Sequence, residues 1–352
     1  FLQAAETWAV RGMPANPQAW LYAVAKQKTL YYLRRDKLFQ TKMVTLMSQR
    51  DGSTAELREP DFSIQNIKDS ELAMIFAVCI PTIASEAQVA LALRVLCGFG
   101  IDEIADAFFT NKETINKRLY RAKIRLRTEG VTLDFPRKEM LSVRLDSVLH
   151  IIYLLFNEGY YSRTKNQTLR KDLCFEGLRL GLILIENEIT DLPKTDALVA
   201  LMCFHASRLG ARQAIKNYLI TYQDQDESLW DKGLINRGLH FLDRASRGVE
   251  LSSYHLEAQI AYWHCLKQDT EKKWIAILNL YDQLLLVNYS PAVALNRTFA
   301  LYKVMGWQAA LAEVQAPDLQ NDHFYFVLLG ELYKNCDRQK AAQNFQRAIT
   351  MA

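Results

Sequence analysis

The stretch from Gly100 to Arg127 reads GIDEIADAFFTNKETINKRLYRAKIRLR, and it predicts two short helices joined by a tight turn. In its first half, apolar side chains recur at i, i+3, i+4 and i+7, the spacing of one helix face. They are Ile101, Ile104, Ala105 and Phe108. The segment from Thr110 to Glu113 then fits the capping-box pattern S/T-x-x-E. A second helix is therefore predicted to begin at about Asn111.

The second predicted helix combines a narrow apolar seam with a wide basic surface. The seam comprises Ile115, Leu119, Ala122 and Leu126. Seven cations stand against the single Glu113, so the helix carries 7 − 1 = +6; they are Lys112, Lys117, Arg118, Arg121, Lys123, Arg125 and Arg127. A helix of this kind suits the major groove of DNA.

Within that helix, the early polar side chains of Thr114, Asn116 and Lys117 are predicted to face base edges, and the later arginines to meet phosphates. The alternative interpretation is a solvated surface helix held by salt bridges. Acidic partners four residues away are scarce in the sequence, which favours DNA binding.

Composition indicates ordinary globular material: 352 residues, of which 50% are hydrophobic and 23% charged, enough for two or three domains. No apolar run approaches the roughly 18 residues of a membrane span, and no signal peptide is present. The chain opens on Phe1, so its natural amino terminus is expected to be missing. Six scattered cysteines without a C-x-x-C pair indicate neither zinc nor disulfides and fit a reducing cytoplasm.

Positive charge is concentrated in the first third of the chain. Through Lys138 there are 20 Lys and Arg against 15 Asp and Glu, a balance of +5; the remainder has 43 − 20 = 23 against 39 − 15 = 24, a balance of −1. This asymmetry predicts a nucleic-acid-facing first part and a neutral body.

Near the amino terminus, Asn16 and Pro17 have the residue types of a helix cap and first turn, which predicts a helix from Gln18 to Lys37. Its basic side chains are candidate DNA contacts together with Asn16; they are Lys26, Lys28, Arg34 and Arg35. The polar segment 50–69 is predicted to be a linker.

The rest of the chain is predicted to be all-α. Helices from Ser70 to Cys79 and from Ser85 to Cys97 would support the helix–turn–helix, and the segment 128–138 looks like a boundary. From residue 139 to 352 the pattern is helical, with helix pairs toward the end. The last pair resembles a degenerate tetratricopeptide repeat; its pattern residues are Leu329, Gly330, Tyr333, Ala341, Phe345 and Ala348.

These motifs together resemble a bacterial sigma factor of the extracytoplasmic-function type. The run from Asn16 to Lys26, followed by Leu33-Arg34-Arg35, is similar to the helix of sigma domain two that engages the minus-ten element. Glu103-Ile104-Ala105 and the run from Glu113 to Arg127 look like the minus-35-reading motif of domain four, although Glu113 replaces the usual glycine. The segments 153–160 and 169–180 resemble the extension shared by one subgroup of these factors.

The resemblance implies four parts: residues 1–49 as a partial sigma domain two, the linker, residues 70–130 as domain four, and residues 139–352 as a helical extension with tetratricopeptide-like repeats. The upstream half of domain two, which grips the polymerase clamp in the family, is not in this sequence. The implied function is cytoplasmic transcription initiation, with promoter DNA and core RNA polymerase as partners. A protein or peptide partner of the repeats is also expected, because stacked helix pairs form binding surfaces.

No enzymatic activity, cofactor or metal is expected. The six histidines show no H-x-x-x-H spacing, and there is no phosphate-binding glycine loop. His205 and His264, each among apolar residues, are expected to be satisfied core histidines. Three alternatives stay open: a helix–turn–helix regulator that acts without polymerase, an enzyme site in the helical body around the segment 156–161, and a scaffold with a vestigial basic part.

Overall fold

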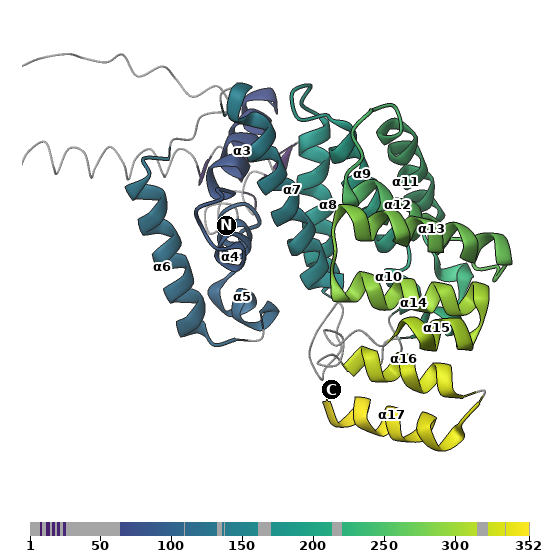
Figure 1. The fold of residues 1–352 in the computed structure, drawn as a ribbon. Coiled ribbons are helices and arrows are strands. Elements are labelled where there is room, and N and C mark those ends of the chain that lie inside the picture. Colours follow the sequence, from purple (N-terminus) through teal and green to yellow (C-terminus); the bar gives the residue numbers. More distant parts are fainter. Residues whose placement is uncertain are drawn as a thin grey trace, which may run out of the picture. The chain divides into compact units, whose positions relative to one another are not determined.

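The computed structural model describes positions 8, 12–14, 16, 17, 20, 21, 24, 25, 64–108, 110–131, 136, 138–160, 170–212, 220–314, 323–334 and 336–351. The described residues form helices joined by turns and contain no strand, which confirms the all-α prediction for this part of the chain (Figure 1). Contacts divide the chain into two units. The first comprises Phe1–Ala77 with Val131–Phe135, and the second comprises Val78–Gly130 with Pro136–Ala352.

In the first unit, the long helix is α3, Ile64–Val78, which crosses into the second unit at its last residue. It begins inside the segment 50–69 that was predicted to be a linker, six residues before the predicted start. The turn-forming residues end at Ser63, and Ile64 and Ile67 already have helical apolar spacing. Closer to the amino terminus, the rings of Trp8 and Trp20 lie 5.5 Å apart.

The second unit opens with three short helices: α4, Ser85–Val95; α5, Ile101–Ala107; and α6, Lys112–Thr128. The chain leaves α4 through Gly98, whose φ of +75° is a left-handed value that favours glycine. The helix α6 packs against both α4 and α5 (Figure 1). The two helices predicted between Gly100 and Arg127 are therefore present, packed on each other and on α4.

The helical body, which comprises α7 to α17, follows in the same unit. Its first part is built on α7, which packs against α8, and on α9, which contacts α8, α11 and α12. Nearly every side chain of α9 is buried, so this helix forms the centre of the body. The elements are α7, Lys138–Tyr160; α8, Lys171–Ile185; α9, Pro193–Ala206; α10, Leu209–Arg212; the short 3-10 helices η1, Tyr222–Asp224, and η2, Glu227–Leu229; α11, Lys232–Ala245; and α12, Ser253–Trp263.

One part of α7, Met140–Tyr160, is long and apolar enough to cross a membrane by length and composition alone, with a mean hydropathy of 1.3. The sequence analysis did not anticipate a segment of this kind. In the folded chain, Leu145, Val148 and Leu149 of this helix are fully buried. The helix packs against α8, α9 and α4, so it is a core helix of the second unit.

The body ends in helix pairs, as the sequence predicts. Ser290 caps α14, because its hydroxyl accepts a hydrogen bond from the Val293 amide at 3.2 Å. In the last pair, a Cβ added at Gly330 would lie 2.6 Å from the Phe345 ring, so glycine permits the close approach of the two helices. The elements are α13, Glu271–Val287; α14, Pro291–Met305; α15, Trp307–Glu313; α16, His323–Tyr333; and α17, Arg338–Met351.

Candidate nucleic-acid interface

The apolar seam of α6 faces inward, as predicted. Ile115, Leu119 and Ala122 are buried, and Leu126 is half-buried. On α5, Ile104 and Ala105 are buried as well. Burial of this seam against α4 and α5 fixes which side of α6 faces solvent.

The amino-terminal cap of α6 differs from the prediction by one residue. Asn111 is the cap: its Oδ1 accepts a hydrogen bond from the Thr114 amide at 2.7 Å. The predicted capping box of Thr110 and Glu113 is therefore wrong. The amide of Thr110 instead donates to the Ala105 carbonyl at 3.0 Å and so belongs to the end of α5. Asn is as good a cap as Thr, and the sequence pattern did not separate the two adjacent candidates.

The basic surface of α6 is exposed to solvent. Thr114 and Arg118 are half-buried, and the other predicted DNA contacts of this helix are exposed: Lys112, Asn116, Lys117, Arg121, Lys123 and Arg125. Arg127 is exposed too. At 1.5 Å per residue the helix, with 17 residues, is about 25 Å long.

Three cations of α6 pair with carboxylates, more than the sequence analysis expected. Lys112 Nζ lies 2.8 Å from Asp102 of α5, and Lys117 Nζ lies 2.7 Å from Glu113. Arg125 pairs with Glu129, likewise at 2.7 Å. Exposed pairs contribute roughly 0–1 kcal/mol and exchange readily with other anions, so they leave these cations available to phosphate.

The remaining cations of α6 differ in their surroundings. The Arg118 guanidinium lies 5.8 Å from the Phe108 ring centroid and so also helps to hold the turn between α5 and α6. Arg121, Lys123 and Arg127 form no ion pair with any residue in the described part of the chain. Their charges are the most directly available for a nucleic-acid backbone.

Two apolar side chains of α6 that the sequence analysis did not single out are exposed. Tyr120 is 67% exposed and Ile124 is 43% exposed. They are one helical turn apart and lie opposite the buried seam. If α6 lies in a DNA groove, an exposed apolar pair of this kind has the chemistry to contact thymine methyl groups. The sequence did hold a signal for their exposure, because neither residue belongs to the predicted inward-facing seam.

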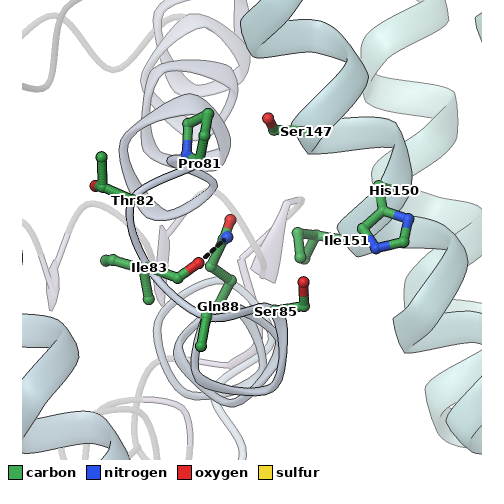
Figure 2. A pocket seen from close by; sticks show the side chains of 9 residues that line it. Pro81, Thr82, Ile83, Ser85, Gln88, Ser147, His150 and Ile151 are labelled. Carbon is green, nitrogen blue, oxygen red and sulfur yellow. Dashed lines mark hydrogen bonds between the residues drawn. The ribbon is translucent and has the colours of Figure 1, made fainter.

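The carboxyl end of α6 is tied to the turn before α4. Glu129 accepts a hydrogen bond from the Thr82 hydroxyl at 2.8 Å while it pairs with Arg125. The same turn borders a cavity of about 290 Å³, which α7 lines from the other side through Ser147, His150 and Ile151 (Figure 2). Partial burial lowers the pKa of His150, so its ring is neutral near neutral pH.

The predicted contacts near the amino terminus are mostly outside the described residues. Asn16 is exposed, and its carbonyl accepts a hydrogen bond from the Trp20 amide at 3.1 Å, the arrangement of a helix start. Lys26, Lys28, Arg34 and Arg35 lie outside the part of the chain that the structure describes.

The segment 156–161, considered as an enzyme site, contains a close helix contact. A Cβ at Gly159 would lie 2.6 Å from the Arg170 carbonyl oxygen, so α7 and the start of α8 approach closely there. Gly159 does not end α7, which runs to Tyr160. His264, expected to be a core histidine, is half-buried with its ring centroid 5.2 Å from that of Tyr222, and burial lowers its pKa to about 3. His205 is half-buried too, and its buried Nδ1 atom has no hydrogen-bond partner among the residues that the structure describes, so this ring is not the satisfied histidine that was expected.

Comparison with known proteins gives two similarities. Residues 144–246, which lie in the helical body, match a family of unknown function, DUF6596. No solved structure matches the chain. A protein of Rhizobium meliloti (strain 1021), itself described only as uncharacterized, is 31% identical over 359 residues, which cover 100% of this chain and 84% of that protein. The chain therefore belongs to the same protein family as this Rhizobium meliloti protein.

Proposed function

We propose that this protein is a sigma factor of the extracytoplasmic-function type, which directs RNA polymerase to particular promoters in the cytoplasm. The observation that carries the proposal is the geometry of α6. The helix buries a narrow seam against α4 and α5 and exposes a basic surface that carries a net charge of +6.

In this proposal α6 lies in the major groove of the minus-35 element. Its early residues, Asn116 and Lys117, face base edges, while Arg121, Lys123 and Arg127 neutralise phosphates. The segment 1–49 acts as the partial sigma domain two at the element that melts. Sequence is selected by these contacts, and RNA synthesis belongs to the polymerase.

The helical body has a separate role in the proposal. Its successive helix pairs, α13 to α17, are tetratricopeptide-like repeats whose surface holds a protein or peptide partner. Support comes from the close packing of α16 on α17 at Gly330 and Phe345, where a small residue meets a bulky one. The body also holds the helix–turn–helix through the contact between α4 and α7.

The first experiment measures duplex binding by gel-shift titration at several salt concentrations. Neutralisation of about five phosphates gives a slope of log affinity against log salt near −4 to −5. The variant with both Arg121→Gln and Lys123→Gln is expected to bind at least tenfold more weakly at low salt, with a slope smaller by about 2.

The matched control changes two exposed cations of the body, Arg247→Gln and Lys340→Gln, and should leave both quantities unchanged. Equal losses in the two double variants would show that net charge, rather than the α6 surface, governs binding.

A second experiment separates a sigma factor from a regulator that acts alone. Core RNA polymerase and the full-length gene product are incubated with genomic fragments, and transcripts are mapped. Start sites that depend on the protein and are lost in the Arg121→Gln, Lys123→Gln variant support the proposal. Duplex binding without any polymerase-dependent transcript would favour the regulator instead.

A further inference from the structure

A group of basic and aromatic side chains converges inside the helical body, away from α6. His205, Arg208 and Arg212 follow one another at i, i+3 and i+7 across the junction of α9 and α10. This spacing brings the three side chains to one side of the chain. They meet Tyr160 at the end of α7 and Tyr222 in η1.

Tyr160 is the first meeting point. The Arg212 guanidinium lies 4.0 Å from the centroid of its ring, and the His205 ring centroid lies 4.6 Å away. The Nη2 atom of Arg208 donates a hydrogen bond to the Tyr160 hydroxyl at 3.4 Å. Three basic side chains thus surround one buried phenol.

Tyr222 is the second meeting point. The Arg208 guanidinium lies 5.5 Å from its ring centroid and the Lys273 ammonium 5.1 Å. Lys273 also donates a hydrogen bond to the Tyr222 hydroxyl at 2.9 Å. Burial raises the pKa of Tyr222 to about 12, so its hydroxyl stays neutral and supplies no negative charge.

Two cations of this region, Arg208 and Lys273, form no ion pair with the described residues. Arg208 is 6% exposed and Lys273 is 1% exposed. The charge of Asp269 partly offsets the effect of burial on the pKa of Lys273, but the Asp269 carboxylate forms its ion pair with the Lys303 ammonium, at 2.8 Å. Cations buried without a counter-ion are costly, which favours the presence of an anion from outside the chain.

Two buried polar atoms in the group have no hydrogen-bond partner among the described residues. They are Nε of Arg208 and Nδ1 of His205. Arg208 Nη2 donates to the Tyr160 hydroxyl, whereas the neighbouring Nε–H group has no acceptor in the part of the chain that the structure describes. A buried guanidinium N–H is rarely left in this state, since the lost hydrogen bond costs about 1–3 kcal/mol or more.

We propose that this group, formed by Tyr160, His205, Arg208, Arg212 and Tyr222, binds a compact oxyanion, namely the phosphate or carboxylate group of a small molecule. Arg208 is the principal donor, because a guanidinium presents N–H groups in the planar arrangement that oxyanions accept. Arg212 and the nearby Lys273 supply further charge. His205, Arg212 and Tyr222 are half-buried, so this side of the group reaches the protein surface.

The test measures thermal unfolding and calorimetric binding of the full chain with inorganic phosphate, and separately with succinate, against chloride at equal ionic strength. A saturable rise in melting temperature is expected with at least one of the two anions. Phosphate alone identifies a phosphate ligand, succinate alone a carboxylate ligand, and both the shared oxyanion chemistry.

Two variants locate the binding. Arg208→Lys keeps the charge and loses the planar donor edge, and Arg212→Gln changes a half-buried side chain that is less able to disrupt folding. Each is expected to weaken the dissociation constant at least tenfold. The Arg121→Gln, Lys123→Gln variant is the matched control for the basic surface of α6, and it should bind the anion as the unaltered chain does.

Three outcomes would overturn the proposal: no stabilisation beyond chloride by either anion, unchanged dissociation constants in both Arg208→Lys and Arg212→Gln, or loss of anion binding only in the α6 variant. None of these depends on whether the protein acts as a sigma factor.

Discussion

Glu257 of α12 is a carboxyl group whose ionisation opposes folding. Its Oε2 atom accepts a hydrogen bond from the Tyr153 hydroxyl at 2.9 Å, yet burial raises its pKa to about 7. In the unfolded chain the group ionises near its ordinary pKa of 4.5. The folded state therefore holds a proton that the unfolded state has lost, and stability falls as the pH rises from about 4.5 to about 7.

Replacing this carboxyl group tests that linkage. Glu257→Gln removes the ionisation. The free energy of unfolding of this variant, relative to that of the unaltered chain, should therefore rise between pH 5 and pH 8. The expected rise is roughly 1–2 kcal/mol, because the residue is only half-buried. Urea unfolding at the two pH values measures the difference. Glu271→Gln, at an exposed position, is the control. A difference that is constant with pH would show that Glu257 ionises at the same pH in both states.

At the level of single residues, sequence reasoning identified inward-facing side chains better than buried charges. The spacing of Ile115, Leu119 and Ala122 was enough to predict their burial. The sequence analysis missed the group around Arg208, because an arginine between apolar residues cannot be told from an ordinary surface arginine by sequence pattern. Only the fold brings Arg208 next to Tyr160, which is 48 residues away along the chain.

At the level of elements, α6 offers a test of which side chains read sequence. Arg121→Ala should weaken binding to promoter and scrambled duplexes alike, since phosphates carry no sequence information. Substitutions at Asn116 or Lys117 should instead change the preference for the promoter, by about 1–3 kcal/mol for a good base contact. Gel-shift titrations on both duplexes distinguish the two effects.

Arg118→Ala is a less direct probe, because Arg118 also contacts Phe108 and its loss loosens the packing of α5 on α6. Equal losses on both duplexes for every substitution in α6 would contradict base readout by Asn116 and Lys117.

Several element boundaries were predicted to within a few residues. The start of α4 at Ser85 agrees with the prediction, and its end at Val95 lies two residues before the predicted Cys97. The cap of α6 was missed by one residue, because Thr110 and Asn111 are both good caps and the Thr110 amide bonds the Ala105 carbonyl at the end of α5. The start of α3 was missed because polar residues inside a helix resemble a linker in composition.

For the whole molecule, the exposure of the α6 surface limits how the helical body can act on it. The side chains of Arg121, Lys123 and Arg127 are exposed to solvent in the full chain, so the body does not cover them. What the body does provide is support: α7 packs on α4, the helix on which α6 rests. Control through the body would therefore act by positioning the helix–turn–helix.

A shortened chain that ends at Lys138 tests this distinction. It is expected to unfold at a lower temperature, because α4 loses its contact with α7 and exposes apolar surface. Its affinity for promoter duplex at 10 °C, corrected for the folded fraction by circular dichroism, should match that of the full chain within about twofold, because the same cations are exposed in both. Transcription with core polymerase should fall several-fold if positioning matters.

Two full-length variants test the same distinction without the risk that the shortened chain misfolds. Ser147→Trp places an indole in the cavity between α7 and the turn before α4 (Figure 2). Ser142→Trp places one at an exposed position of the same helix. Transcription should change with the first and not with the second, while duplex affinity stays constant in both. A tenfold gain in duplex affinity in the shortened chain would show instead that the body masks α6. If transcription is unchanged both in the shortened chain and in Ser147→Trp, the body has no part in promoter control.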